Sequence, residues 1–504
     1  MPNAKIEFTF DDLLTIVKKN YKKPDLKLIQ SAYDLAAGAH QGKKRQTGHD
    51  YIIHPIATAC KLAEMKLGMN CLAAGLLHDV VEDTGVTVEQ IRAQFGDDVA
   101  KLVDAVTKLK LVKYNGDDMY AENMRRMFLA MAEDVRVVFI KFADRLHNLR
   151  TLFARPPEKQ LRIAREVLEI YAPIANRLGM GEMRGDLEDL AFTYYDPKAY
   201  QQVNTLLERK VREKEKVVNQ TMDATKKDLQ ELEVTPISIH GRVKRLYSLY
   251  RKLQKYDNDI SKIYDIIAVR IIVSDVSECY TVLGILHKRW RPLAGRIKDY
   301  IAQPKPNGYQ SLHTTVFAEE GAIVEFQIRT SEMHEHAEYG VAAHWRYKEG
   351  EKVKAKDMKW MDELAHIHKA LETNKDYLGQ LEEMKLEVFK DRIFVFTPKG
   401  DVIDLPEGST PVDFAYAIHT DLGNKCMGSR VNDKRTNVDA ELRSGDMCEI
   451  IIDKNRKGPN ADWLKFVKTH QARSKIRDAT KSVMKAWLTK MVGKSKKPSL
   501  GKAG

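Results

Sequence analysis

Four ionisable side chains, His78, Asp79, Glu82 and Asp83, directly follow an apolar run that ends at Leu77. The apolar run predicts a buried helix, and burying unpaired charge is costly unless the charged groups hold a cation or take part in chemistry. His78 and Glu82 are four residues apart, as are Asp79 and Asp83, so a continuing helix would bring each pair onto nearly one face. The sequence therefore predicts a metal site at the end of a buried helix.

Two further candidate ligands, His54 and Asp144, lie where charge again interrupts an apolar run. Together with His78 and Asp79 they supply two imidazoles and two carboxylates. This set suits a borderline-hard divalent ion such as Mn²⁺, with open positions for water and substrate, better than structural zinc, which favours thiolates. The competing interpretation is that His54 and Asp144 are ordinary polar residues at helix ends.

Length and cysteine usage limit the class of protein. The 504 residues are enough for about three domains, and no apolar run reaches the roughly 18 residues that a membrane helix needs. Charged side chains near Met1 argue against a secretory leader. The five cysteines show no CxxC spacing, so we expect neither a zinc ribbon nor a disulfide framework. We expect a cytoplasmic protein with no membrane partner.

The positive charge is concentrated at the C-terminus. Residues 454–504 contain 15 Lys or Arg and 2 Asp, so this segment accounts for the net charge of +12. One interpretation is a solvated basic helix, and the other is contact with RNA phosphates, which counterion release favours. We expect residues 494–499 to be disordered. We also expect the chain to be the N-terminal portion of a longer protein.

The expected secondary structure changes along the chain. Residues 1–200 predict successive helices, separated by breaks at Gly42, Gly68, Gly96, Gly116 and Pro156-Pro157. The regions that follow are a long charged helix from about 205 to 232, strands from 235 to about 329, helices to about 386, and a second β-rich stretch from 389 to about 453.

The strand-rich region contains a second pair of carboxylates. Residues 263–273 are rich in β-branched side chains and predict a strand with Asp265 at its start. Glu325, Gln327 and Arg329 alternate with apolar residues, so they share one face of another strand. If these strands are adjacent, Asp265 and Glu325 would make a seat for the Mg²⁺ of a nucleoside triphosphate.

Basic and aromatic residues surround these strands. In residues 241–252 the cations are at helical spacing, and the side chains expected on one side are Lys244, Ser248 and either Arg251 or Lys252. Residues 296–299 and 305–313 add cations and a turn with Pro306 and Gly308 that lets the backbone approach a ligand. The ring of Tyr309 can stack on a base. These features predict two bound nucleotides, and the alternative is a solvated basic face with Tyr309 in the core.

These motifs resemble the Rel/SpoT family, the bifunctional (p)ppGpp synthetases and hydrolases of the bacterial stringent response. The resemblance rests on His-Asp-x-x-Glu-Asp at 78–83 together with Gly-Tyr-Gln-Ser-Leu-His at 308–313. It implies a multidomain α and α+β chain: an all-helical HD-type hydrolase, a nucleotidyltransferase-like mixed sheet with helices, a small β-grasp TGS domain and a basic helical tail. The implied domains are the hydrolase with a helical linker bundle (1–200), the synthetase (201–345), a helical linker (346–390), the TGS domain (391–454) and the basic segment (455–504).

The resemblance implies two opposing reactions. The synthetase would transfer pyrophosphate from ATP to the 3′-OH of GDP or GTP, and the hydrolase would split (p)ppGpp into GDP or GTP and pyrophosphate. The implied Mn²⁺ ligands of the hydrolase are His54, His78, Asp79 and Asp144, and Glu82 and Asp83 would orient or deprotonate the attacking water. The implied nucleotide-binding residues of the hydrolase are Arg45, Thr47, Asn148 and Thr151. Asn148 lies four residues beyond Asp144, so a helix would aim both at one pocket.

For the synthetase, the resemblance implies that Asp265 and Glu325 coordinate Mg²⁺, and we expect Glu325 to accept the 3′-OH proton. The residues expected to bind the two nucleotides are Arg242, Lys244, Ser248, Lys252, Lys298, Lys305, Asn307, Tyr309, His313 and Gln327. The Arg-x-Lys-Asp motif at 296–299 stands where members that only synthesise carry an acidic motif. We therefore expect both activities, with GDP preferred in synthesis, and coupling through the helices near 155–195 that lets one site work at a time.

Three further points concern binding partners. His419 matches the family position that meets the 3′ end of deacylated tRNA, so tRNA and the ribosome are expected partners, although a packing role explains a single histidine equally well. His334, His336 and His344 match a family segment without a metal, so no metal is assigned there. The competing functions are a hydrolase with a vestigial synthetase and a noncatalytic regulator that senses nucleotides and binds RNA or ribosomes; such a sensor would need no water-activating Glu82.

Overall fold

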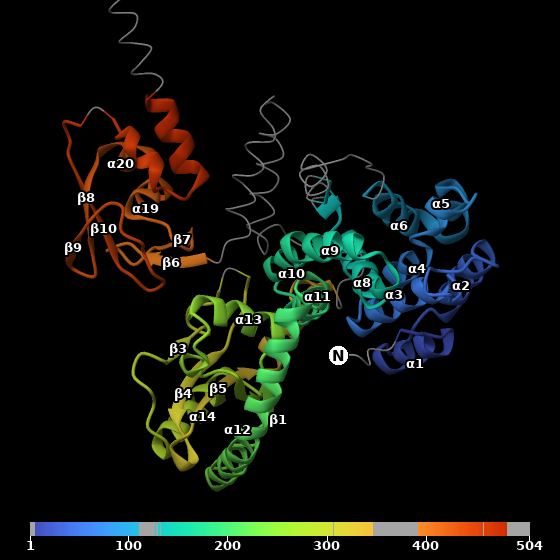
Figure 1. Ribbon diagram of the computed structural model, residues 1–504, viewed down its shortest axis with the longest axis horizontal. Helices are drawn as coiled ribbons and strands as arrows, with labels where there is room; N and C mark the ends of the chain where they lie inside the picture. Colours follow the sequence, from blue (N-terminus) through green and yellow to red (C-terminus); the bar gives the residue numbers. More distant parts are fainter. Residues whose placement is uncertain are drawn as a thin grey trace, which may run out of the picture. The chain divides into compact units, whose positions relative to one another are not determined.

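The computed structural model describes residues 6–109, 126–127, 130–131, 133–305, 307–345, 392–456 and 458–480. The chain divides into two units, Met1–Thr373 and Asn374–Gly504 (Figure 1). The first contains a helical part followed by a mixed sheet with helices, and the second contains two small sheets with short helices.

The helical part follows the predicted breaks. Its helices are α1 (Phe10–Asn20), α2 (Leu26–Ala39), α3 (Ile53–Glu64), α4 (Met69–Leu77), α5 (Val80–Asp83), α6 (Val88–Lys108), α8 (Arg136–Arg150) and α9 (Pro157–Glu166). Gly42 has a positive φ in the turn after α2, Gly68 is the N-cap of α4, and Gly96 interrupts α6 with a φ of 86°. Pro157 opens α9, where its missing N–H is not needed. These predicted breaks are confirmed, and Gly116 lies outside the described residues.

Helices α3, α4 and α8 pack together at the centre of this part. All residues of α3 from His54 to Ala63 are buried, and α4 is buried from Cys71 onward. A helix that is apolar on all sides belongs in a core, so the prediction of a buried helix before His78 is confirmed. The polar side chains that these three helices carry must therefore satisfy one another.

The expected continuous helix through residues 78–83 is wrong. Helix α4 ends at Leu77, His78 and Asp79 form a turn, and α5 adds a single turn from Val80. The ring Nδ1 of His78 lies 2.8 Å from the carbonyl oxygen of Gly75, within its own helix. His78 and Asp79 keep right-handed helical dihedral angles, and the Asp83 N–H donates to the Asp79 carbonyl at 2.9 Å.

A helical linker connects the two parts of the first unit. It consists of a π-helical segment (Val167–Tyr171), α10 (Ala172–Arg177) and α11 (Gly181–Tyr195). Helix α11 contacts α8 on one side and the helices of the next part, α13 and α15, on the other. Where the linker meets α15, the Val341 N–H donates to the Leu178 carbonyl at 2.9 Å, and Gly340 allows the two backbones to approach.

The mixed sheet has the order β1-β2-β5-β4-β3. Its strands are β1 (Ser238–Val243), β2 (Ile267–Val273), β3 (Lys298–Asp299), β4 (Leu312–Phe317) and β5 (Ile323–Thr330), and its helices are α12 (Pro197–Glu231), α13 (Leu246–Lys255), α14 (Val276–Arg289), α15 (Ser331–Tyr339) and α16 (Val341–Trp345). Strands β2 and β5 are parallel neighbours, while the other pairs are antiparallel. The long predicted helix is thus α12, and the two strands expected to carry the carboxylates are adjacent.

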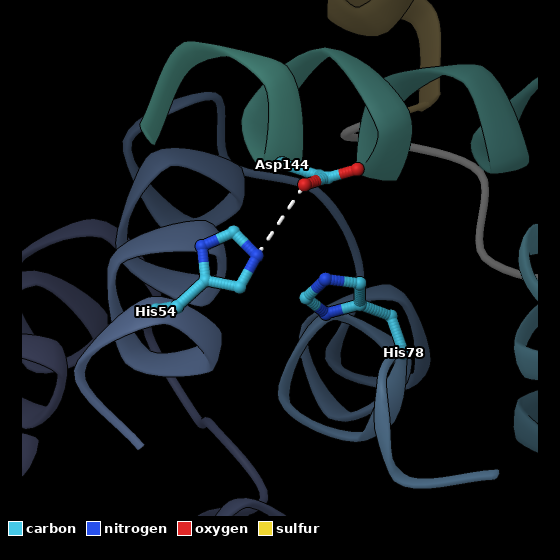
Figure 2. A group of neighbouring side chains, drawn as sticks. All are labelled: His54, His78 and Asp144. Atoms are coloured by element: carbon cyan, nitrogen blue, oxygen red, sulfur yellow. Dashed lines mark ion pairs between the residues drawn. The ribbon is translucent and has the colours of Figure 1, made fainter. Parts of the chain in front are cut away.

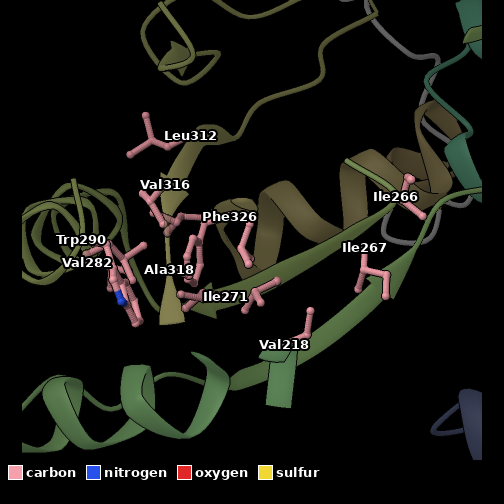
Figure 3. Packing of buried hydrophobic residues seen from close by; sticks show 14 of the residues in the cluster. Val218, Ile266, Ile267, Ile271, Val282, Trp290, Leu312, Val316, Ala318 and Phe326 are labelled. Atoms are coloured by element: carbon pink, nitrogen blue, oxygen red, sulfur yellow. The ribbon is translucent and has the colours of Figure 1, made fainter. Parts of the chain in front are cut away.

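One face of this sheet is apolar. Figure 3 shows Ile271, Phe326 and Val316 from three strands packed with Val282 of α14 and with Val218 of α12. Val324, Phe326 and Ile328 are buried in this core, so the predicted alternation along β5 is confirmed. Glu325 and Gln327 therefore project from the opposite face.

The second unit has the sheets β10-β8-β9 and β6-β7. Its elements are β6 (Arg392–Phe396), β7 (Val402–Pro406), α19 (Pro411–Ile418), α20 (Thr420–Lys425), β8 (Cys426–Val431), β9 (Lys434–Thr436), β10 (Cys448–Ile452) and a 3₁₀ helix (Ala461–Lys465). Buried Trp463 and Val467 pack in its core, and the Thr469 N–H donates to the Asp413 carboxylate at 2.8 Å. The start of the expected basic segment is thus a structural component of this unit.

None of the helices in the described ranges combines the length and the apolar character needed to cross a membrane.

We predict that Gly340→Ala destabilises the first unit by at least about 2 kcal/mol. Gly340 has φ 55° and ψ −134°, and a Cβ there would lie 1.9 Å from the Leu178 carbonyl oxygen. Gly284→Ala is the matched control, because Gly284 is exposed on α14 and a Cβ would meet nothing within 4 Å. Denaturant unfolding followed by circular dichroism should show a loss for the first variant and no loss for the second.

Asp189 generates a pH-dependent prediction. Burial raises the pKa of this carboxyl to about 6, against the lowering effects of the Tyr247 N–H and of Arg245. The folded state therefore holds the proton to a higher pH than the unfolded state, so stability falls as pH rises from about 4 to 6. Asp189→Asn, which cannot ionise, should raise the free energy of unfolding at pH 7.5 by about 1–3 kcal/mol, with a smaller gain at pH 4.5.

Asp186→Asn provides the contrast. Asp186 is paired with Arg245 at 2.9 Å and with Lys61 at 3.5 Å. Its neutralisation should lower stability at pH 7.5. If Asp189→Asn and Asp186→Asn changed the free energy of unfolding equally, burial would not be the cause of the raised pKa of Asp189.

Candidate functional site

Three side chains converge at the centre of the helical part. His54 comes from α3, His78 follows α4, and Asp144 comes from α8, and one ligand atom of each lies within 4.8 Å of the others (Figure 2). His54 Nε2 is 3.3 Å from Asp144 Oδ1. All three are buried, with exposed fractions of 2% or less.

Asp79 joins this group through both of its oxygens. Asp79 Oδ1 lies 3.2 Å from His78 Nε2, and Oδ2 lies 3.4 Å from His54 Nε2. The hydroxyl of Tyr51 lies 3.0 Å from Asp79 Oδ2 and 2.5 Å from Asp83 Oδ2, so it links the buried group to the more exposed Asp83. The fold thus brings together His54, His78, Asp79 and Asp144, the four residues proposed as ligands.

The donor atoms fit a bound cation. A carbonyl oxygen can only accept, so the contact with Gly75 means that His78 carries its proton on Nδ1. Its Nε2 lone pair then faces the carboxylate of Asp79, and this buried atom has no hydrogen-bond partner among the described residues. Lone pairs that face one another without a proton favour a cation between them. Burial also lowers the pKa of His54 to about 4, which keeps its imidazole neutral, as metal binding requires.

Asn148 Nδ2 donates to Asp144 Oδ1 at 2.5 Å, so the two share a pocket as expected. Two supporting side chains, Lys141 and Tyr51, were missed by the sequence analysis. Lys141 Nζ donates to Asp144 Oδ2 at 2.8 Å. Lys141 lies in the apolar run before Asp144, where a buried lysine is itself a signal of a paired charge. Tyr51 stacks on His40 with ring centroids 4.5 Å apart. Helical spacing connects Lys141 to Asp144, whereas the contact of Tyr51 with Asp79 joins positions 28 residues apart.

The residues proposed to bind nucleotide in the helical part fall into two groups. Arg45 Nη2 donates to Asn148 Oδ1 at 2.6 Å, so these two lie together beside Asp144. Thr47 Oγ1 lies 3.1 Å from His49 Nδ1, whereas the hydroxyl of Thr151 is buried and donates to carbonyls of its own helix. The proton of the Thr151 hydroxyl is therefore already used within the helix.

The proposed water-activating residues lie on α5. Glu82 and Asp83 are exposed, unlike the buried ligand group. Lys43 donates to the Asp83 carbonyl, and the Tyr51 hydroxyl contacts the Asp83 carboxylate. The two acidic side chains thus belong to the solvent-facing turn that immediately follows His78 and Asp79.

A second polar centre lies beside the mixed sheet. Asp265, just before β2, accepts hydrogen bonds at Oδ2 from Lys244 Nζ and Lys252 Nζ, both at 2.6 Å. Burial alone would raise the pKa of Asp265, but the two lysines lower it to about 2, so this carboxylate stays ionised. Its Oδ1 is buried and has no hydrogen-bond partner among the described residues, which leaves one oxygen for a cation.

Glu325 lies across from Asp265 on β5. Ala268, three residues after Asp265, pairs with Glu325 in the parallel register. Burial would raise the pKa of Glu325, but His313, whose Nδ1 is 3.4 Å away, and Gln327 lower it overall. Gln327 Nε2 donates to Glu325 Oε1 at 3.0 Å. Both proposed Mg²⁺ ligands are thus ionised and available on the polar face.

An aromatic group adjoins Glu325. Tyr309 and His313 are linked by a 2.8 Å contact between the Tyr309 hydroxyl and His313 Nε2. Lys305 Nζ lies 5.2 Å from the Tyr309 ring centroid and 4.7 Å from that of Tyr300. Asn307 Nδ2 donates to the Asn176 carbonyl of the linker at 3.1 Å. The ring and the cation lie together, and Asn307 is already engaged with the linker.

The predicted helical cation face is only partly correct. Arg242 lies on strand β1, where its Nη1 donates to Gln327 Oε1 at 3.4 Å, and Lys244 lies in the connection to α13. Lys244 and Lys252 meet at Asp265 because a strand and a helix converge, and not because of helical spacing. Ser248 is half-buried on α13, and Lys298 is exposed on β3.

Two buried arginines lie on the same face: the sequence analysis placed Arg329 there but missed Arg270. Arg270 of β2 and Arg329 of β5 both donate to Glu338 Oε1 of α15, at 2.9 and 3.1 Å. Only one carboxylate serves both guanidinium groups, and several of their N–H groups are buried without a hydrogen-bond partner among the described residues. A strand residue such as Arg270 resembles ordinary sheet sequence, so its burial could not be read from the pattern.

In the second unit, His419 is exposed, and its Nδ1 accepts the Asp421 N–H at 3.2 Å as the N-cap of α20. The packing role considered for this histidine is therefore not observed.

The chain matches known domain families in three regions. Residues 32–181 match the HD domain, residues 241–352 match the region found in RelA / SpoT proteins, and residues 393–452 match the TGS domain. The HD match contains the group around His54, and the RelA / SpoT match contains Asp265 and Glu325.

Whole-chain relatives carry the corresponding names. A GTP pyrophosphokinase from Myxococcus xanthus is 45% identical over 92% of this chain and 61% of its own length. A guanosine-3′,5′-bis(diphosphate) 3′-pyrophosphohydrolase from Aquifex aeolicus is 46% identical over 90% of this chain and 64% of its own length. The bifunctional (p)ppGpp synthase/hydrolase SpoT of Escherichia coli K12 is 42% identical over 94% of this chain and 68% of its own length.

The chain thus spans less than two thirds of the first two relatives and slightly more than two thirds of the third. With the three domain matches in the order HD domain, RelA / SpoT region and TGS domain, and with 42% identity to SpoT over 68% of its length, the chain belongs to the Rel/SpoT family.

Proposed function

We propose that this chain both synthesises and degrades (p)ppGpp. The carrying observation is that one chain forms two separate polar centres with opposite charge balance, one around His54 and one around Asp265. The first collects carboxylates and imidazole lone pairs, and the second surrounds a carboxylate with lysines. The first suits a cation with a water ligand, and the second suits a nucleoside triphosphate that brings its own negative charge.

For hydrolysis, we propose that His54, His78, Asp79 and Asp144 hold Mn²⁺. When bound, the metal would lower the pKa of a water ligand and neutralise charge on the departing pyrophosphate. Glu82 and Asp83 would orient this water and take its proton, since both lie on the exposed turn after the ligands. Arg45 and Asn148, in contact at 2.6 Å, would bind the nucleotide, with Thr47 beside them. Thr151 would contribute to the shape of the pocket.

For synthesis, we propose that Asp265 and Glu325 hold Mg²⁺. The cation would neutralise charge on the ATP phosphates during transfer to the 3′-OH of GDP or GTP. An incoming triphosphate would draw Lys244 and Lys252 from Asp265, since phosphate oxygens compete for the same ammonium groups. Because the pKa of Glu325 is lowered, this carboxylate is better suited to hold a cation than to retain the 3′-OH proton, which it would accept only transiently.

The remaining synthetase residues would position the two nucleotides. Tyr309 would stack on guanine, with Lys305 and His313 beside its ring. Arg242 and Gln327, in contact on the polar sheet face, would bind the ATP side. Ser248, Lys298 and Asn307 complete the proposed set, and Asn307 would act through the loop that it holds against the linker.

Two alternatives make different predictions. A hydrolase with a vestigial synthetase would degrade (p)ppGpp but make none, and a noncatalytic sensor would bind nucleotides without turnover. The pKa values of Asp265 and Glu325 are lowered, so both carboxylates are ionised and able to bind a cation. This favours an active synthetase over both alternatives.

We predict that Asp79→Ala abolishes hydrolysis alone and Asp265→Ala abolishes synthesis alone, each by at least about a hundredfold. Each substitution removes a proposed cation ligand from one centre and leaves the other intact. The full chain would be incubated with ATP, GDP and Mg²⁺, and separately with ppGpp and Mn²⁺, before the nucleotides are resolved by chromatography.

The charge control is Asp223→Ala, an exposed residue of α12. It should leave both reactions unchanged. Loss of both activities in Asp79→Ala or Asp265→Ala, with normal circular dichroism, would contradict separate centres, and no turnover by the wild-type chain would favour the sensor.

We also propose that the TGS domain contacts the 3′ end of deacylated tRNA, within or outside the ribosome, through His419. The side chain is exposed beside Ile418, whose exposed fraction is 39%, so it is accessible to a partner. His419→Asn can keep an acceptor for the Asp421 N–H but removes the ring. In a mobility-shift titration, we expect this variant to bind deacylated tRNA several-fold more weakly than wild type. Unchanged binding would reject the assignment.

A further inference from the structure

His147 lies behind His54, on the side away from the proposed metal ligands. Its Nδ1 is 2.9 Å from His54 Nδ1 and 3.1 Å from the Arg45 Nη1 donor. Its Nε2 is 3.2 Å from the carbonyl oxygen of Ile6, in the segment that precedes α1. His147 is itself 2% exposed. Its ring therefore has three polar neighbours, on two ring nitrogens.

Two of these neighbours determine where the His147 proton lies. The Ile6 carbonyl can only accept, so His147 Nε2 must donate. The Arg45 guanidinium can only donate, so His147 Nδ1 must accept. The two constraints agree on a neutral ring with its proton on Nε2.

The same reasoning extends to His54. His147 Nδ1 carries no proton and can only accept, so His54 Nδ1, which faces it, must donate. His147 Nδ1 then accepts from both His54 and Arg45. The His54 proton is then on Nδ1. Its Nε2 keeps a lone pair, which faces Asp144 Oδ1 at 3.3 Å and Asp79 Oδ2 at 3.4 Å.

We propose that His147 is a positioning residue that fixes the Nδ1–H tautomer of His54, so that the Nε2 lone pair of His54 points into the ligand group. The chain of hydrogen bonds runs from the Ile6 carbonyl through His147 to His54. It plays for His54 the role that the Gly75 carbonyl plays for His78. This inference rests on the metal site proposed for hydrolysis and assigns it a supporting residue outside the ligand set.

The opposite tautomer would disable the site. A proton on His54 Nε2 would point at two carboxylates and occupy the position that a cation needs. An imidazole without an external partner populates both tautomers, so part of the protein would bind metal poorly. Groups that orient metal-binding histidines in this way typically affect metal affinity 10–100-fold.

The test compares two isosteric substitutions in the full chain, His147→Asn and His147→Leu. Leu removes both the donor and the acceptor of the ring, whereas Asn keeps an Oδ1 that can accept from His54 and Arg45 and an NH2 that can donate. Mn²⁺ binding to metal-free protein would be followed by electron paramagnetic resonance of the free ion. We expect Leu to weaken binding 10–100-fold and Asn to weaken it by no more than about threefold. Equal binding by wild type and Leu, or equal losses for Asn and Leu, would overturn the proposal.

A second measurement does not depend on metal. Long-range ¹H–¹⁵N correlation spectra of histidine-labelled, metal-free protein report which ring nitrogen carries the proton, and the His54→Ala and His147→Asn spectra identify the two residues. We expect His54 to be protonated on Nδ1 and His147 on Nε2, and His147→Leu to shift His54 toward a tautomer mixture. His54 protonated on Nε2 in the wild type would reject the inference.

The two proposals fail in different ways. If His54→Ala binds Mn²⁺ as tightly as wild type, the metal assignment is wrong, while the tautomer spectra still test His147. If wild type binds Mn²⁺ through His54 and His147→Leu binds equally well, the metal site stands and the role of His147 is wrong. Thermal unfolding midpoints that match between Asn and Leu exclude a merely structural cause.

Discussion

The helical part depends on one constraint: ionisable groups lie in an apolar interior and must compensate one another. His54 at the start of α3, His78 and Asp79 in the turn after α4, and Asp144 within α8 are each at most 2% exposed. Lys141 supplies one positive charge to Asp144. The second buried carboxylate, Asp79, accepts a hydrogen bond from Tyr51 and faces the Nε2 atoms of His54 and His78. A divalent cation would balance this arrangement, and this is why packing and chemistry cannot be separated here.

The polar centre around Asp265 has the reverse charge balance. Asp265 is held by two lysines, and Arg242, Arg270 and Arg329 line the polar face of the same sheet with Glu338 as the carboxylate between two of them. This surplus of positive charge suits a ligand that carries several negative charges. The sheet makes the arrangement possible because its apolar face packs against α12 and α14. The other face is therefore left to polar side chains.

Much of the architecture follows from local sequence. Glycine and proline breaks, the apolar run before His78 and the alternation along β5 act over a few residues, and the structure agrees with them. The errors arose where a local rule was extended too far. The helix expected through residues 78–83 ends at Leu77, and Arg242 lies on a strand, because tertiary contacts decide where an element stops.

The sequence by itself determined which residues are chemically unusual: charges that interrupt apolar runs, paired motifs and a family resemblance. Only the tertiary structure decided which of them meet and what supports them. Tyr51 and His147 are not part of these motifs, yet they contact Asp79 and His54, which lie 28 and 93 positions away in the sequence. The physical reason is that hydrogen bonds and tautomers depend on atoms within about 3 Å, and residue spacing along the chain does not specify such distances between helices.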